Sequence, residues 1–181
     1  MIRASLTALA LTSTSALAQS CPPAPDHSER LAQLIAEAQS APTEMDGRLA
    51  SNKMWDLWAD APDETAQEIL DSGLRKRRAF DLLGARADFD RLIDYCPDYA
   101  EGYNQRAFVN FIRQDYEIAL QDLDRALNRS PNHVAALAGK ALTLIGLKRQ
   151  DEAQTVLRQA LSLNPWLAER QFLTEPDGQE L

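Results

Sequence analysis

Apolar and small residues recur along the chain in a unit of constant length. Proline returns every 34 residues, at Pro97, Pro131 and Pro165. Small or large apolar residues keep the same step in three further sets: Gly73, Ala107 and Ala141; Ala85, Ala119 and Ala153; Phe89, Leu123 and Leu157. Several positions in one register over about 100 residues indicate an internal repeat.

Each unit is predicted to contain two helices. In the unit 100–133, apolar residues at helical spacing predict a first helix over about 100–113 and a second over about 116–129. Pro131 ends the second helix, because proline cannot continue a helix and restricts the residue before it. Small residues let the two helix axes approach closely, and each pair leaves an apolar face that the next pair must cover. The pattern therefore predicts an all-α protein built from stacked antiparallel helix pairs.

The unit resembles the tetratricopeptide repeat (TPR), a 34-residue helix–turn–helix with large, small, alanine and proline positions in a set order. The units 100–133 and 134–167 hold the signature residues Tyr103, Ala107, Ala119, Leu123, Ala126 and Pro131, and Leu137, Ala141, Ala153, Leu157, Ala160 and Pro165. The unit 66–99 is a degenerate copy, with Lys76 where a large aromatic is usual. The resemblance implies a right-handed superhelical stack, a TPR solenoid, of about three repeats plus capping helices.

The first 18 residues have the pattern of an export signal. Arg3 precedes a weakly hydrophobic run that ends in an A-x-A cleavage site at Ala18. This run is too short and too rich in Ser and Thr to span a bilayer. The stretch Tyr99–Ala107 is also similar to that of an uncharacterised group of exported TPR proteins from alphaproteobacteria. We therefore expect cleavage after Ala18, a periplasmic mature protein and no transmembrane helix.

Helices are also predicted on both sides of the repeats. The helices expected over 26–39 and about 44–59 could form a fourth, heavily diverged repeat or an N-terminal cap. The cap is preferred, because their small and aromatic positions do not align with those of the repeats. A short C-terminal capping helix is expected over 166–173. The expected order is 1–18 signal peptide, 19–65 linker and helical cap, 66–99 degenerate TPR, 100–133 TPR, 134–167 TPR, and 168–181 capping helix and tail.

The chain has two cysteines, Cys21 and Cys96. Export to an oxidising compartment permits a disulfide between them, which would close a loop of about 75 residues and tie down the N-terminus. The equal alternative is a buried Cys96 with a free Cys21. A third alternative makes Cys21 the acylated residue of a lipoprotein. That alternative is disfavoured, because Ala18 stands where such signals normally have leucine.

The net charge of −8, from 19 basic and 27 acidic residues, argues against a nucleic-acid partner and against a basic membrane-binding surface. Neither His27 nor His133 has a metal-ligand neighbour at the usual spacing, so no metal is expected. The chain has no G-x-S-x-G, H-E-x-x-H or P-loop motif. We expect no catalytic residues and no cofactor. An enzyme with an unrecognised site near Arg77 and Asn104 is the alternative from another class.

Two charged clusters are interpreted as solvated helix surface. Arg75–Arg78 point around a helix rather than in one direction, and lie near its C-terminal end, where the macrodipole favours positive charge. Acidic residues recur on the predicted second helices without the glycine and glutamate that an EF-hand needs: Asp88, Asp90, Asp94, Asp98, Asp122 and Asp124. We expect these acids to lie on the solvated convex face.

The TPR resemblance implies a concave groove lined by the first helix of each repeat. It places there Leu74, Arg77, Arg78, Glu101, Asn104, Phe108, Phe111, Leu142 and Ile145. An apolar floor with basic residues at one end suits a peptide with an acidic or carboxylate end. The specialised clamp for chaperone C-termini is not expected, because Ala135 and Gly139 replace its basic residues.

The sequence therefore predicts a non-catalytic adaptor for an unidentified envelope protein or peptide. In one alternative, the protein's own cap or tail fills the groove. In another, the protein is a lipid-anchored assembly factor of the outer membrane.

Overall fold

The computed structural model describes residues 20–174. The predicted signal peptide, 1–18, lies outside the described residues, as do residues 175–181 of the predicted tail. Between residues 20 and 174 the chain forms eight α-helices and one 3-10 helix, which confirms the all-α fold class. The elements are α1 (Ser28–Gln39), α2 (Glu44–Trp58), α3 (Glu64–Arg78), α4 (Leu82–Tyr95), α5 (Ala100–Ile112), α6 (Tyr116–Arg129), α7 (Val134–Gly146), α8 (Gln150–Leu163) and η1 (Ala168–Phe172).

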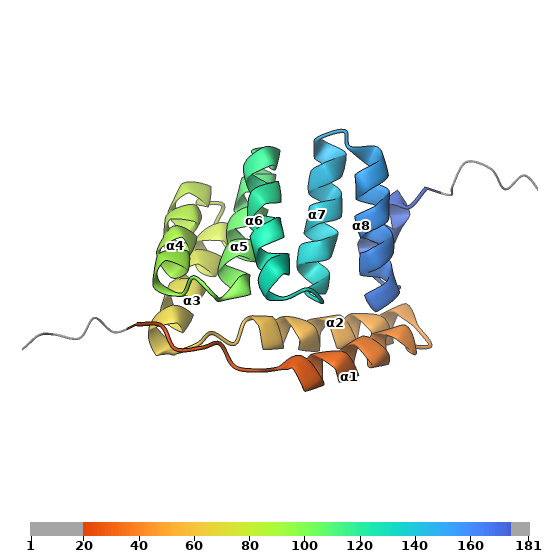
Figure 1. The fold of residues 1–181 in the computed structure, drawn as a ribbon, viewed down its shortest axis with the longest axis horizontal. Coiled ribbons are helices and arrows are strands. Elements are labelled where there is room, and N and C mark those ends of the chain that lie inside the picture. Colours follow the sequence, from red (N-terminus) through yellow and green to blue (C-terminus); the bar gives the residue numbers. More distant parts are fainter. Residues whose placement is uncertain (1–19, 175–181) are drawn as a thin grey trace, which may run out of the picture.

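Three antiparallel helix pairs, α3–α4, α5–α6 and α7–α8, stand side by side as an array (Figure 1). Small residues let the helices of a pair approach closely. Ala107, Ala119, Ala141 and Ala153 are fully buried, and a Cβ atom at Gly73 would overlap the ring of Phe89. The 34-residue pattern of small and large residues is therefore the packing pattern of the pairs.

The turn inside each pair has the same backbone conformation. Phe80, Gln114 and Lys148 lie 34 residues apart and have φ values of 61°, 64° and 60°. In the first turn, the amide of Phe80 donates to the carbonyl oxygen of Arg77, and the amide of Asp81 donates to that of Lys76. These two bonds form a Schellman motif, whose left-handed position is usually glycine. The chain has no glycine at any of these three turns.

Ion pairs join the helix pairs with the same period. The guanidinium of Arg106 on α5 lies 2.8 Å from Asp90 on α4 and 2.7 Å from Asp122 on α6. One repeat later, Lys140 on α7 lies 2.6 Å from Asp124 on α6. Residues of opposite charge therefore connect each repeat to the next.

Two of the acidic residues expected on a solvated face are buried instead. Asp88 is only 3% exposed and Asp122 only 1%. Asp88 lies 2.7 Å from Lys76 on the paired helix, and Asp122 pairs with Arg106 and Arg125. Their charges are satisfied inside the array by long basic side chains, which the helical period alone could not show.

The α1–α2 hairpin lies across one end of the array, beneath α6, α7 and α8 (Figure 1). Its apolar residues pack against Val134 at the start of α7, and its far end contacts α8. There, Gln39 donates to the carbonyl oxygen of Ser162 (2.7 Å), and Asn164 donates to the hydroxyl of Ser51 (2.7 Å). The hairpin therefore does not simply cap the first repeat, because its apolar face is buried along the array as far as the last one.

The C-terminal segment differs from the predicted capping helix. It forms the 3-10 helix η1, in which no residue is buried. Side-chain hydrogen bonds hold its end: Gln154 donates to the carbonyl oxygen of Phe172 (2.9 Å) and accepts from the amide of Thr174 (2.8 Å). A segment of five residues without a buried apolar face lacks the packing that stabilises an α-helix.

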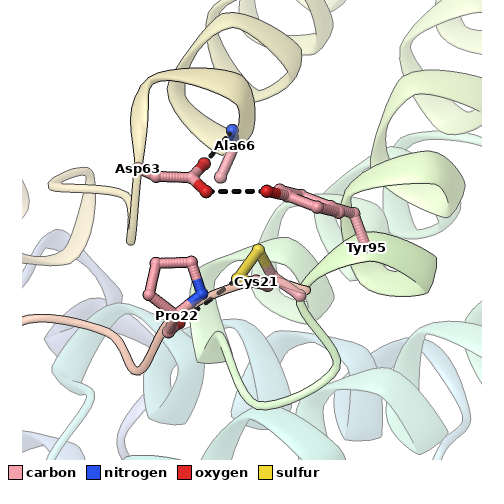
Figure 2. The surroundings of a disulfide bond; sticks show 6 residues. Cys21, Pro22, Asp63, Ala66 and Tyr95 are labelled. Carbon is pink, nitrogen blue, oxygen red and sulfur yellow. Dashed lines mark hydrogen bonds between the residues drawn. A yellow bond between two sulfur atoms is a disulfide. The ribbon is translucent and has the colours of Figure 1, made fainter. Parts of the chain in front are cut away.

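Cys21 and Cys96 form a disulfide 75 residues apart in the chain. The sequence left open whether these two cysteines are bonded, and the structure shows the disulfide. Figure 2 shows the surroundings of the bond, where Asp63 accepts hydrogen bonds from the amide of Ala66 (2.8 Å) and the hydroxyl of Tyr95 (2.7 Å). Cys96 ends α4 and is buried, so the disulfide ties the N-terminal segment to the first helix pair.

None of the helices between residues 20 and 174 is both long and apolar enough to cross a lipid bilayer.

Candidate functional site

An apolar hollow lies on the face formed by α5 and α7. Its volume is about 300 Å³, and α2, α3 and the segment after α8 complete its walls. Phe108 and Phe111 on α5 and Leu142 on α7 supply its apolar surface. The small residues Ala138 and Gly139 of α7 line it too. We call this hollow the groove.

Phe108 is the most conspicuous residue of the groove. Its side chain lies in the middle of α5 and remains 44% exposed. The guanidinium carbon of Arg77 lies 4.8 Å from the centre of its ring, a cation–π contact between α3 and α5. Phe111 packs against Tyr116 with ring centres 5.6 Å apart. The groove thus exposes one aromatic ring beside a positive charge.

Arg77 is half-buried at the α3 end of the groove and donates a hydrogen bond to the side-chain oxygen of Gln105. Burial lowers the pKa of its guanidinium below the usual value; the carboxylate of Glu101 opposes this effect, and the charge of Arg78 adds to it. The group still carries its charge at neutral pH. A half-buried cation whose hydrogen-bond partner is a neutral amide retains attraction for an anion.

A buried polar cluster supports the groove from below. Glu101 is 1% exposed and accepts hydrogen bonds from Asn104 (3.0 Å) and Gln105. It also lies 2.8 Å from the imidazole nitrogen of His133, which is equally buried. The ring of His133 stacks on that of Trp58, with centres 4.0 Å apart. This cluster orients the two amide side chains that line the groove.

Five of the nine residues predicted to line the groove do so. They are Arg77, Asn104, Phe108, Phe111 and Leu142. All five lie on the first helix of a repeat, as the resemblance implied.

The other four predicted residues lie elsewhere, each for a packing reason. Leu74 is buried in the core between α3 and α4, and Glu101 is turned into the polar cluster. Arg78 is exposed at the end of α3, outside the groove. Ile145 packs against the buried cluster of Leu120, Leu144 and Ala153. Small changes in rotation and depth along a helix decide between these environments.

The lining residues that were not predicted from the sequence include Trp55, Gln105, Leu167 and Glu169. Trp55 is half-buried and forms part of the groove wall from α2. Segments outside the repeats, α2 and the residues after α8, thus form part of the groove wall and leave Phe108 exposed. Gln105 could have been predicted to lie near the groove, because it directly follows Asn104 on the same helix. The other three depend on where the flanking segments fold, which the repeat pattern does not contain.

The groove presents aromatic and aliphatic surface, amides, one guanidinium and one carboxylate. Such a surface can recognise a peptide by apolar contact and hydrogen bonding. Within residues 20–174, no group of three or more His, Cys, Asp and Glu side chains could hold a metal ion.

Comparisons with known proteins agree with the repeat pattern. Residues 111–165 match the family model described as tetratricopeptide repeat. A TPR repeat-containing protein of Rhizobium etli is 30% identical over 122 residues, which cover 64% of this chain and 57% of that protein. A tetratricopeptide repeat protein 36 homolog of Nematostella vectensis is 40% identical over 73 residues, 40% of each chain. The chain thus spans about half the length of these curated relatives.

Solved structures show the same fold. The Arabidopsis OM64 TPR domain superposes with a TM-score of 0.58 at 21% identity, covering 60% of this chain and 89% of that domain. The TPR2B domain of yeast Sti1, in a complex with pHsp70, gives a TM-score of 0.57 at 24% identity, covering 61% and 91%. The first TPR domain of Spaghetti, bound to an HSP90 peptide, gives 0.57 at 18% identity, covering 59% and 89%.

Proposed function

Since the chain carries tetratricopeptide repeats, we propose that it is a non-catalytic adaptor of the periplasm that binds a protein or peptide partner in its groove. One observation carries the proposal: Phe108 is held on the groove floor with 44% of its surface exposed. An exposed aromatic side chain in a concave apolar site, beside a charged group, is typical of a recognition surface.

The known use of the fold supports a peptide partner. The yeast Sti1 and Spaghetti domains named above bind peptides or partners from Hsp70 and HSP90. Their identity to this chain is too low to transfer those ligands. The proposal for this chain is therefore a protein or peptide of its own compartment.

Two features support an exported protein. The first is the pattern of a positive charge, an apolar run and a cleavage site at Ala18. The second is the disulfide between Cys21 and Cys96, since disulfides persist in oxidising compartments such as the periplasm. A bonded Cys21 has no thiol to acylate, which favours this form over a lipid-anchored one. Mass spectrometry of the protein from its own periplasm tests signal cleavage and the state of Cys21. An uncleaved N-terminus would contradict cleavage after Ala18, and a thioether-linked lipid would contradict a bonded Cys21.

Site-specific photocrosslinking in the cell tests the groove. A photoreactive phenylalanine analogue is placed at Phe108, and in a control at Ile118, which is 43% exposed on α6 outside the groove. We expect a discrete crosslinked partner from position 108 and none from position 118. The partner should also be lost from a Phe108→Glu variant that keeps its helical circular dichroism, and retained by Ile118→Glu. Identical crosslinks from both positions would contradict a partner in the groove.

A further inference from the structure

The geometry points to one class of ligand: an extended peptide with an acidic side chain at the α3 end of the groove, large apolar side chains in the middle, and a basic side chain at the η1 end. This inference rests on the proposed function and adds to it the chemistry of the partner. The occupant is thus selected by two opposite charges at the two ends of one apolar surface.

The charges of the groove are arranged as a dipole. Among the described residues that line it, Arg77 and Glu169 carry charge. Arg77 belongs to α3 and Glu169 to η1, which lie at opposite ends of the array (Figure 1). The surface between them is formed mainly by aromatic, aliphatic and amide side chains. A ligand with two acidic ends would be repelled by Glu169, and one with two basic ends by Arg77.

Both charges are available to a partner. Arg77 donates to the neutral amide of Gln105 and packs on Phe108, and it takes part in none of the ion pairs within residues 20–174. Glu169 is likewise absent from those ion pairs. Its neighbour Arg170 is directed away, to Glu44 on α2 at 2.9 Å. Charged groups at a groove that form no internal ion pair determine specificity more than affinity.

The size of the groove favours an extended ligand over a helix. A volume of about 300 Å³ accommodates a few side chains, whereas a helix has a diameter of about 10 Å with its side chains. From α3 to α7 the groove crosses two helix–helix steps, or about 20 Å in all. An extended chain covers this distance in about six residues. Because Glu169 lies on η1, beyond α7, we expect the acidic and basic residues of the ligand to be separated by at least about that number.

Selection from a random peptide library tests the charge pattern even while the natural partner is unidentified. A phage-displayed library of peptides of about twelve residues, twice the expected span, is selected on the folded protein. Each pool is counter-screened on Phe108→Glu, which identifies peptides that depend on the groove. We expect the enriched peptides to share an acidic and a basic residue on either side of aromatic or leucine residues.

Charge reversal then assigns each end. For a selected peptide, Arg77→Glu should weaken binding by about tenfold or more, and replacing the acidic residue of the peptide with lysine should restore binding to this variant. Glu169→Lys should likewise weaken binding, and replacing the basic residue of the peptide with an acidic one should restore binding to this variant. The matched controls are Arg78→Glu, an exposed neighbour outside the groove, and Glu68→Lys, an exposed residue of α3. Both controls should bind like the unaltered protein.

The outcomes separate the inference from the proposed function. Peptides that need Phe108 but lack a common charge pattern, or that bind Arg77→Glu and Arg78→Glu equally, would overturn the inference and leave a peptide-binding groove. A failure to enrich any peptide that depends on Phe108 would overturn both.

Discussion

A carboxylate oxygen of Glu101 lies 2.8 Å from the imidazole of His133, and each residue is only 1% exposed. The two residues are 32 positions apart: Glu101 lies on α5, and His133 is the N-cap of α7, the first helix of the next pair. Glu101 also binds the amides of Asn104 and Gln105, which line the groove. The pair therefore couples the packing of two repeats to the shape of the groove.

Replacing His133 with alanine should lower the free energy of unfolding by about 3 kcal/mol, because Glu101 would lose a buried partner. The change also removes the ring that stacks on Trp58. Urea unfolding followed by circular dichroism measures the effect. His27→Ala is the matched control, since His27 pairs with Asp60 at the surface and its loss should cost under about 1 kcal/mol. Equal costs for the two variants would contradict a structural role for the buried pair.

Reducing the disulfide should destabilise the protein by up to about 4 kcal/mol, because a loop of 75 residues gains freedom in the unfolded chain. The urea midpoint should fall when dithiothreitol is added to the unaltered protein. Cys21→Ser should have the lower midpoint already and should not respond to the reductant. A midpoint that is the same with and without reductant would mean that the bond does not contribute to stability.

Glycine at the turns inside the helix pairs should stabilise the array. Gln114 and Lys148 have positive φ, a conformation that costs a residue with a Cβ atom about 1–2 kcal/mol. Gln114→Gly and Lys148→Gly should each raise the free energy of unfolding by about 0.5–1 kcal/mol, after the entropy cost of glycine. Gln114→Ala is the control and should not stabilise, because alanine keeps the Cβ atom. Thermal unfolding of the three variants measures this, and a glycine variant no more stable than the alanine variant would contradict the argument.

Asp88 should make the protein sensitive to acid. Burial by itself would raise the pKa of this carboxyl, but hydrogen bonds from Lys76 and Ser72 and the charges of Lys76 and Arg91 hold the pKa below its usual value. A lowered pKa in the folded state contributes stability above the unfolded value of about 4. This stability is lost as the pH falls through the folded pKa.

Asp88→Asn should therefore lose stability at neutral pH and lose less than the unaltered protein as the pH falls from about 4. Asp94→Asn, an exposed change on the same helix, should leave the pH dependence of unfolding as it is. Parallel pH profiles for the unaltered protein and Asp88→Asn would show that this carboxylate does not link protons to folding.

The helices and repeats could be predicted from the sequence because their signals are local. Pro131 and the small residue Ala107 act within one helix pair, and the helices expected over 100–113 and 116–129 differ from α5 and α6 by one residue at one boundary. The buried acids show the limit of such signals. Asp88 and Asp122 occupy equivalent repeat positions, yet a charged residue on a helix gives no local sign of the partner that will bury it.

Groove residues could be predicted on the helices of the repeats but not on the segments outside the repeats. Phe108 and Leu142 lie where the resemblance implied, because each first helix presents the same face to the concave side. Glu101 and Leu74 were assigned to that face but are buried, since a rotation of a few tens of degrees separates a groove position from a core position.

By itself, the sequence determined the repeat length and the helix pairs, because both follow from residues near one another in the chain, and its resemblance to the TPR placed Phe108, Phe111 and Leu142 in the groove. Only the tertiary structure decided that α2 forms a wall of the groove and that Arg77 and Glu169 stand at its two ends. These positions depend on how the segments outside the repeats pack against the array. Such packing is set by shape and charge between residues more than 100 positions apart in the chain, as in the contacts of Gln39 with Ser162 and Ser51 with Asn164.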